Sequence, residues 1–378
     1  MKRALIVLGA AALLAVAWTS AYGAETYKIG AIFSITGANA PLGVPEKDTV
    51  EMIVEQINKT GGINGHKLEA IVMDDAGDET KANLAAKKLI ESDKVCAIVG
   101  PSLTGTSLAV AAGAQAARIP LISCAAGAVI VTPTKPYVFK TAQSDIHAVA
   151  KVLDYLKAHD LTRVAFLNVT NAFGKSGKDQ MQKQSPRAGI RVIAWDEFGD
   201  KDTNMTAQLT RIRGKNPQAV VCWGTNPGPA LVARDMKALK MKTPLIMSHG
   251  IANKKFIELA GDAADGVIFP AGRLIVVNEI ARNEPQRKAL LGYAAAFKKK
   301  YGRDPDTFGG HAWDAVMLVV RAMRKVGDDP AKIRDEVEKT RLVGISGVFA
   351  FSPTDHNGLG KDAFVMVQIK NGKWKMLT

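Results

Sequence analysis

The sequence predicts an α/β protein built around parallel sheets. Short apolar segments that suit strands alternate with amphipathic segments that suit helices through most of the 378-residue chain. Strands that are joined by helices form parallel sheets with helices on both faces. Hydrophobic residues make up 47% of the chain, and the chain is longer than the roughly 100–200 residues of one typical domain. Two domains, each with its own core, are therefore expected.

The first 24 residues predict a cleaved secretory signal peptide. Lys2 and Arg3 precede an apolar stretch from Ala4 to Trp18, and small residues fill the end of the segment. The stretch is shorter than the roughly 20 residues that a membrane-spanning helix needs. No cysteine lies near the expected cleavage region to carry a lipid anchor. The expected location of the mature protein is the periplasm.

The elements that follow can be read from periodicity. A first strand begins at Tyr27, and in the helix after it Val50, Ile53 and Ile57 recur on one face. The Gly61-Gly62 pair ends that helix. Further apolar runs predict strands at residues 68–73, 95–99, 121–123, 138–141, 164–168, 192–195, 220–223, 245–247 and 267–269. Helices separate most of these strands.

The order of elements changes from Glu284 onward. Consecutive helices are predicted there, at residues 285–301, 308–326 and 330–340. Two extended segments, 347–351 and 364–369, follow them. Asn371-Gly372 then suits the two-residue turn of a β-hairpin. The chain is therefore expected to end in strands.

The order of motifs near the amino terminus resembles a known family. Residues 27–43 read Tyr-Lys-Ile-Gly-Ala-Ile-Phe-Ser-Ile-Thr-Gly-Ala-Asn-Ala-Pro-Leu-Gly, and an amphipathic helix leads on to Asn58-Lys-Thr-Gly-Gly-Ile-Asn-Gly65 and to Asp74-Asp75. This order resembles the periplasmic binding proteins of branched-chain amino acid ABC transporters, the leucine/isoleucine/valine-binding protein family. The tail from Phe349 to Gly358 resembles the members that take up aromatic or other organic acids.

The resemblance implies two Rossmann-like lobes with a hinge and a ligand cleft between them, the type I periplasmic binding protein fold. In this family the chain crosses between the lobes three times, and crossings are expected near Ala142, Ala271 and Val343. Lobe one would comprise residues 25–142 and 272–342. Lobe two would comprise residues 143–271 and 343–378.

The strongly basic composition has two interpretations. The formal net charge is +14, which could indicate contact with nucleic acid or a membrane surface. The lysines and arginines are spread over polar helix faces, and no aromatic RNA-binding motif accompanies them. A solvated basic surface is the preferred interpretation, with no nucleic-acid partner. The charge would also speed encounter with anionic ligands.

No motif for catalysis, a cofactor or a metal is found. Gly174-Lys175-Ser176 resembles the end of a phosphate loop, but Val169 stands where the leading glycine would have to be. The glycine fingerprint of dinucleotide binding does not follow the first strand, and there is no Gly-x-Ser-x-Gly elbow. The six histidines form no His-x-x-x-His pair, and the three cysteines are interpreted as buried thiols. A non-enzyme without cofactor or metal is expected.

Two strand ends predict a cradle for a carboxylate. Ser102 and Thr104 lie where a strand passes into a helix, beside N–H groups that the helix leaves free. The segment 121–127 offers backbone groups at the end of the next strand. The resemblance implies that Ser102, Thr104, Ala125 and Gly127 contact the ligand. The alternative is that Ser102 and Thr104 only cap the helix.

Other positions depart from the amino acid binders of the family. Gly127 stands where they have a threonine that holds the ammonium, and His249 aligns with their ammonium-binding glutamate. Leu42, Phe173 and Thr225 replace three tyrosines. A buried ammonium needs a paired negative charge, and an imidazole cannot supply one. An acid without the amine is therefore the predicted ligand.

Selectivity is expected to come largely from lobe two. Phe173, Trp223 and Phe308 are candidate aromatic walls, and His249 or His311 could bond a second polar group such as a phenol, hydroxyl or keto oxygen. Each has an alternative: Trp223 could belong to the core, and His311 could only tie a helix to a neighbouring loop.

The sequence thus predicts a monomeric substrate-binding protein of an ABC importer, which delivers a small carboxylate to an inner-membrane permease and ATPase complex. A rival keeps this role and takes branched-chain or other neutral amino acids, with a carboxylate from an unrecognised loop. A second rival is a periplasmic ligand-sensing subunit, and an enzyme on the same scaffold is the most distant one.

Overall fold

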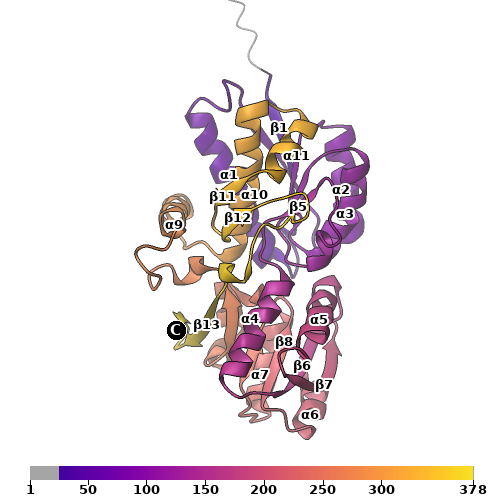
Figure 1. Ribbon diagram of the computed structural model, residues 1–378, viewed down its shortest axis with the longest axis vertical. Helices are drawn as coiled ribbons and strands as arrows, with labels where there is room; N and C mark the ends of the chain where they lie inside the picture. The colour runs from indigo at the N-terminus through magenta and orange to yellow at the C-terminus, as the bar shows by residue number, and fades with distance from the viewer. Residues whose placement is uncertain (1–24, 378) are drawn as a thin grey trace, which may run out of the picture.

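The computed structural model describes residues 25–377 and consists of two lobes stacked along the long axis of the molecule (Figure 1). Each lobe has a mainly parallel sheet with helices packed against it, so the predicted α/β class is confirmed. The predicted signal peptide lies outside the described residues. Within residues 25–377, no helix combines the length and the apolar character that crossing a bilayer requires.

The sheet of lobe one has five parallel strands in the order β2-β1-β3-β4-β5. Its strands are β1 (Tyr27–Phe33), β2 (Leu68–Asp74), β3 (Ile98–Val99), β4 (Leu121–Ser123) and β5 (Val138–Lys140). Its helices are α1 (Ala40–Lys59), α2 (Glu79–Glu91), α3 (Thr104–Ala116), α9 (Arg287–Tyr301), α10 (Thr307–Val326) and α11 (Pro330–Glu338). The strand predicted at 95–99 is shorter than expected, because the ladder with β1 covers only its last two residues.

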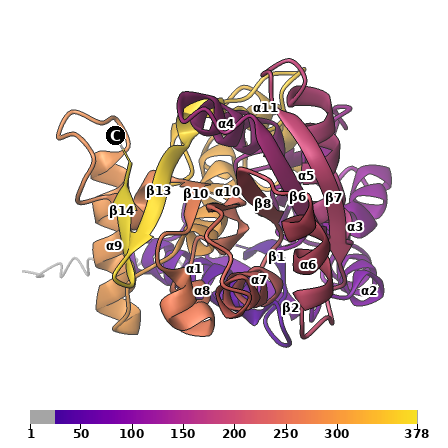
Figure 2. The same ribbon diagram turned by 90° about the horizontal axis from the view of Figure 1, so that it is seen from below.

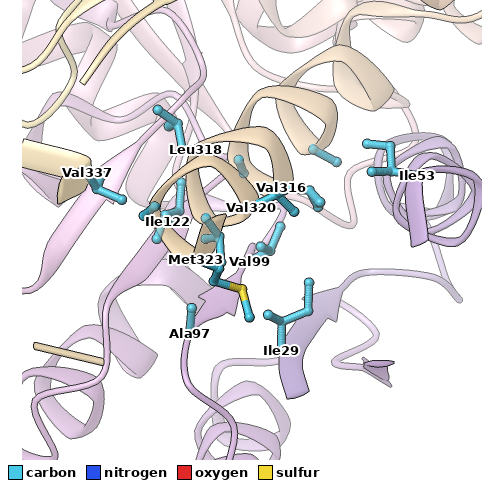
Figure 3. Close-up of a cluster of buried hydrophobic side chains, with 14 of the residues drawn as sticks. Ile29, Ile53, Ala97, Val99, Ile122, Val316, Leu318, Val320, Met323 and Val337 are labelled. Carbon is cyan, nitrogen blue, oxygen red and sulfur yellow. The ribbon is translucent and has the colours of Figure 1, made fainter. Parts of the chain in front are cut away.

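One part of the core of lobe one lies between this sheet and the helices α1 and α10, and another lies between the sheet and α2 and α3. Figure 3 shows Ile29, Val99 and Ile122 of the sheet facing Val316 and Val320 of α10. All five are fully buried. The apolar face of α10 therefore packs on the sheet of lobe one, although the strands of that sheet come from the first part of the chain.

The sheet of lobe two has seven strands in the order β14-β13-β10-β9-β8-β6-β7. They are β6 (Arg163–Val169), β7 (Arg191–Phe198), β8 (Ala219–Trp223), β9 (Leu245–Met247), β10 (Ile268–Ala271), β13 (Val365–Lys370) and β14 (Lys373–Met376). Its helices are α4 (Asp145–Ala158), α5 (Ala172–Gln184), α6 (Thr206–Gly214), α7 (Gly228–Ala238) and α8 (Lys254–Ala260). Figure 2 shows β13 and β14 at one edge of this sheet and β7 at the other.

The predicted carboxyl-terminal hairpin is confirmed. β13 and β14 pair antiparallel, with Lys370 opposite Lys373. Asn371 and Gly372 between them have φ angles of 50° and 68°. Two successive positive φ angles are the geometry of the turn that Asn-Gly favours in hairpins.

The segment after Val343, where the last crossing between the lobes is expected, packs mainly on lobe one. The antiparallel pair β11 (Arg341–Val343) and β12 (Val348–Ala350) is separate from both large sheets. Phe349 and Leu359 lie in the core of lobe one, whereas β13 pairs with β10 of lobe two. We propose that the crossing lies between Leu359 and Val365, because the packing of these apolar side chains, which periodicity does not reveal, holds the intervening segment on lobe one.

Both sheets place a topological switch point toward the interface of the lobes. In lobe one the chain runs from β1 to β2 on one side and later to β3 on the other; in lobe two, β7 and β8 flank β6 in the same way. Loops at the carboxyl ends of strands beside a switch point form the crevice in which α/β proteins bind ligands. The fold therefore directs two sets of such loops to one site.

Candidate ligand-binding cleft

A cleft of about 370 Å³ lies between the two lobes. Lobe one lines it with the loops after β1, β2, β3 and β4, and lobe two with the loops after β6, β7, β8 and β9. Eight of the ten predicted ligand-binding residues line this cleft: Leu42, Ser102, Thr104, Ala125, Phe173, Thr225, His249 and Phe308. Gly127 and Trp223 are not among its lining residues. The volume falls within the range of small-molecule sites.

The amino terminus of α3 forms one wall of the cleft. Its N-cap residue, Leu103, has no side chain that can accept a hydrogen bond, and no other described side chain caps the helix. The first intrahelical bond of this turn is donated by Ser107 N to Leu103 O. The backbone N–H groups of Thr104, Gly105 and Thr106 therefore precede the first acceptor of the helix and are available to an anion.

The amino terminus of α5 in lobe two also lines the cleft, and the side chain of Asn171 caps it. The side chain of Asn171 accepts hydrogen bonds from Phe173 N at 3.0 Å and Gly174 N at 3.1 Å. Asn171 also donates through Nδ2 to Asp200 Oδ1 at 2.8 Å. Of these two helix termini at the cleft, only that of α3 keeps its donors for a ligand.

Ser102 and Thr104 do not act as helix caps. Ser102 Oγ accepts from Ser34 N at 3.0 Å and forms a short hydrogen bond with Glu46 Oε2. Thr104 Oγ1 accepts from Gly127 N at 3.2 Å, which leaves the threonine hydroxyl proton free for another acceptor. The described contacts of these two hydroxyls therefore do not include a cap of α3.

Gly127 influences the cleft through its neighbour. A β-carbon at Gly127 would collide with the side chain of Thr104, so only glycine leaves room for the observed position of Thr104. Ala125 lines the cleft, and its N–H donates to Ser123 Oγ at 3.0 Å. The backbone after β4 is thus held in place by hydroxyl groups on both sides.

Trp223 lies in the core of lobe two, as the alternative interpretation had it. The side chain is fully buried within a cluster that includes Phe166 and Ile246. Its ring centroid is 6.1 Å from that of Phe173 and 5.9 Å from that of His249. Trp223 therefore supports two cleft residues from behind rather than contacting the cleft itself.

His249 presents an uncharged imidazole to the cleft. Only 6% of the residue is exposed, and neither ring nitrogen has a hydrogen-bond partner among residues 25–377. The rings of Phe173 and Phe364 lie edge-on to it at centroid distances of 5.6 and 5.3 Å. Burial, helped by the positive charge of Lys140, lowers the pKa of His249 to about 3. A neutral imidazole offers a ligand one donor and one acceptor.

His311 ties a helix to a neighbouring loop, as one interpretation of the sequence had it, and it also lines the cleft. Its Nδ1 hydrogen-bonds to Ser346 Oγ at 2.8 Å, which ties α10 to the loop before β12. Phe308 packs edge-on to it, with centroids 6.2 Å apart. Burial lowers the pKa of His311 to about 3. This part of the cleft therefore carries no positive charge from imidazole at neutral pH.

Sequence reasoning missed several polar residues of the cleft. Glu79 and Asp200 are two carboxylates that line it, one from each lobe, and Asn39 and Lys201 line it with them. Glu79 and Asp200 are exposed, so water solvates both carboxylates. Glu79 opens α2 and Asp200 follows β7, and only the approach of the two lobes brings them together. They keep open the alternative of a ligand with an ammonium group.

Polar contacts between the lobes border the cleft. Ala128 N donates to Ser176 Oγ at 3.2 Å, and Asn253 Nδ2 donates to Pro41 O at 3.3 Å. Lys254 of α8 donates to Asp304, in the loop before α10, at 2.8 Å. These contacts join segments that belong to different sheets and would favour the approach of the lobes.

Comparisons with known proteins agree with this architecture. A family model described as periplasmic binding protein matches residues 26–373. A leucine-, isoleucine-, valine-, threonine- and alanine-binding protein of Pseudomonas aeruginosa is 26% identical over 347 residues, with 90% of each chain covered. A Leu/Ile/Val-binding protein of Rhizobium johnstonii is 29% identical over 310 residues, with 79% of each chain covered.

Solved structures show the same fold. An extracellular ligand-binding receptor of Rhodopseudomonas palustris HaA2 has a TM-score of 0.88 at 26% identity, with 93% of this chain and 99% of that chain covered. A solute-binding protein of R. palustris in complex with benzoate has a TM-score of 0.81 at 22% identity, over 93% and 95% of the two chains. The match over nearly the whole described chain shows that this protein belongs to the family of periplasmic binding proteins, of the branched-chain amino acid type.

Proposed function

We propose that this protein is the extracytoplasmic substrate-binding component of an ABC importer, binds a small carboxylate between its lobes and delivers it to a membrane permease. Membership of the family supports the transport role and a location outside the cytoplasm. Binding would favour the closed form, because the ligand contacts both lobes at once. No chemical step is part of this role.

The observation that carries the proposal is the uncapped amino terminus of α3 at the wall of the cleft. Its free N–H groups, the positive end of the helix dipole and the hydroxyl of Thr104 all suit an anionic group. A carboxylate held there would extend toward the apolar side chains of Leu42 and Phe173.

We further propose that the ligand is an aromatic or aliphatic organic acid without an amine. His249 stands buried and neutral at the position that the family resemblance assigns to an ammonium-binding glutamate, and an imidazole cannot balance a buried cation. Its donor and acceptor suit a hydroxyl or keto group. A related fold holds benzoate, so an aromatic acid can be accommodated by this architecture.

Amino acids are the second candidate ligands. The named relatives at 26% and 29% identity bind leucine, isoleucine and valine. Glu79 or Asp200 could face the ammonium group from the cleft wall. The same importer role would apply to either ligand class, whereas a ligand-sensing subunit would share the cleft and differ in its partner.

A thermal-shift screen of the ligand-free mature protein tests the proposal. The panel contains benzoate and phenylpropanoid acids, aliphatic keto and hydroxy acids, and neutral amino acids. A ligand at about 100 times its Kd should stabilise the protein by about 2.7 kcal/mol. Stabilisation by deaminated acids supports the organic-acid ligand, and stabilisation by leucine alone supports the amino acid ligand. A protein that no carboxylate stabilises would contradict the proposed function.

A further inference from the structure

A buried carboxyl group lies directly behind the carboxylate wall of the cleft. Glu46 of α1 is fully buried, and its Oε2 shares a short hydrogen bond with Ser102 Oγ. Its other oxygen, Oε1, has no hydrogen-bond partner in the described part of the chain. Ser102 therefore stands between Glu46 on one side and the cleft on the other.

The surroundings of Glu46 disfavour a charge. The ionisable groups that face it are the buried carboxyl of Asp75, directly after β2, and the half-buried carboxyl of Asp306, at the start of α10, together with the thiol of Cys124. No described lysine, arginine or histidine forms an ion pair with it. Burial raises the pKa of Glu46 well above 4.5, against the lowering effect of Ser102, and Asp306 and Asp75 raise it further. Such a group retains its proton more readily than an exposed glutamate.

The protonation of Glu46 decides which way the Ser102 hydroxyl can point. A hydroxyl has one proton to donate and two lone pairs that accept. Ser34 N already donates to one lone pair of Ser102 Oγ. If Glu46 is ionised, the single Ser102 proton must go to Glu46, and a lone pair faces the cleft. If Glu46 is protonated, its own O–H donates to the second lone pair, and the Ser102 proton is free.

We propose that protonated Glu46 is a positioning residue of the cleft, which donates to Ser102 Oγ and so frees the Ser102 hydroxyl to donate to the ligand's carboxylate. The inference rests on the proposed function, since it requires an anionic ligand beside Ser102. An ionised Glu46 would withdraw that donor and place a second negative charge next to the carboxylate. Binding of the anion is therefore coupled to retention of one proton by Glu46.

The coupling has a defined pH dependence. The affinity for a carboxylate should be constant where Glu46 is protonated in the free protein. It should fall by up to about tenfold per pH unit above the pKa of Glu46, because each binding event must then take up one proton. The ligand's own carboxyl group is already ionised at pH values above the pKa of Glu46, so it contributes no such slope.

The test compares Glu46→Gln with the wild type. The glutamine amide donates to Ser102 Oγ at every pH, so the variant should bind as tightly as the wild type at low pH and show no slope from about pH 5 to about pH 9. Benzoate and L-leucine are the probes, measured by calorimetric titration in two buffers of different ionisation enthalpy. Wild type should take up protons on binding at high pH, and Glu46→Gln should not.

Asp75→Asn supplies the matched control. Asp75 is another buried carboxyl of the same network, which accepts from Ser34 Oγ at 2.7 Å and Gly77 N at 2.8 Å and does not contact Ser102. Removing its charge should move the midpoint of the affinity profile to lower pH and preserve the slope. A slope that disappears in Asp75→Asn and persists in Glu46→Gln would overturn the assignment to Glu46.

A second measurement separates this inference from the proposed function. Infrared difference spectra between ligand-free wild type and Glu46→Gln should show the carbonyl band of a protonated carboxyl group at about pH 5, and the band should decrease as the pH rises. If neither these probes nor any other acid of the thermal-shift panel binds but the band is present, the proposed ligand class is wrong and the protonation of Glu46 stands. If a probe binds without a pH slope, or the band is absent at about pH 5, the inference is wrong whatever the ligand.

Discussion

The ion pair between Lys254 and Asp304 should contribute to closure of the cleft. Lys254 Nζ in lobe two lies 2.8 Å from Oδ2 of Asp304, and Lys298 Nζ of α9 lies 2.9 Å from the other carboxylate oxygen. α9 packs on α1 of lobe one through Tyr293 and Phe297. We expect opening of the lobes to break the Lys254 contact and to preserve the Lys298 contact. The two lysines thus form a matched pair for mutation.

The exposure of the three side chains sets the free energy that the Lys254–Asp304 ion pair can contribute. Hydrogen bonds from Lys254 and then Lys298 lower the pKa of Asp304 to about 2. Relative to its ordinary value of 3.8, this would amount to about 2.5 kcal/mol for the two lysines together. Both lysine side chains are 65% exposed and that of Asp304 is 47% exposed, so solvent screening reduces each pair to about 0.2–1 kcal/mol. Lys254→Ala should therefore weaken ligand binding by roughly 1.5- to 5-fold.

The assay is a calorimetric titration of each variant with the acid that stabilises the wild type most. The loss in Lys254→Ala should disappear in about 1 M salt, where the Debye length is about 3 Å. Lys298→Ala should bind like the wild type at both ionic strengths. Equal weakening by the two substitutions, or no effect of Lys254→Ala at low salt, would refute the assignment of this pair to closure.

Three further substitutions test the account at other positions. His249→Glu should shift the ratio of Kd values about tenfold in favour of leucine over benzoate, since a paired buried charge is worth at least about 1.4 kcal/mol; an unchanged ratio in calorimetric titrations would remove His249 from the site. Asp314→Ala leaves the N–H groups of Ile345 and Ser346, both 2.7 Å from the carboxylate, without their acceptor. It should lower the free energy of unfolding in urea by about 2–5 kcal/mol, and a decrease below about 1 kcal/mol would contradict this role of Asp314. Gly177→Ala in α5 places a methyl group against the Trp223 indole and should cost about 1–3 kcal/mol. The control, Gly292→Ala in α9, meets open space and should be neutral or stabilising by up to about 1 kcal/mol; equal effects on Tm would contradict the packing argument.

Most of the fold could be predicted from the sequence because local periodicity encodes it. The strands expected at 121–123 and 245–247 have those bounds in the structure, and the Asn-Gly hairpin forms where its turn residues require it. The proposed position of the last crossing, between Leu359 and Val365, could not be predicted in this way. It rests on Phe349 and Leu359 lying in one buried cluster with residues of α10, which no local pattern reports.

The cleft was predicted less completely than the fold. Strand ends identified Ser102 and Thr104, since the carboxyl ends of parallel strands meet at one edge. Trp223 was a candidate for the wall with the core as its alternative. Alternate residues of β8 face opposite sides of the sheet, and Trp223 points into the core. Glu79 and Asp200 were missed because they come from different lobes. Glu46 was missed because a single acid in an amphipathic helix looks like a solvated residue until its burial is known.

The central claim is that a carboxylate binds at the amino terminus of α3. A crystal structure of the complex with the most stabilising acid tests it directly. The account predicts carboxylate oxygens within about 3 Å of Ser102 Oγ, Thr104 Oγ1 and a backbone N–H of the first turn of α3. A ligand that places its carboxylate against lobe two, or that binds outside the cleft, would contradict the account.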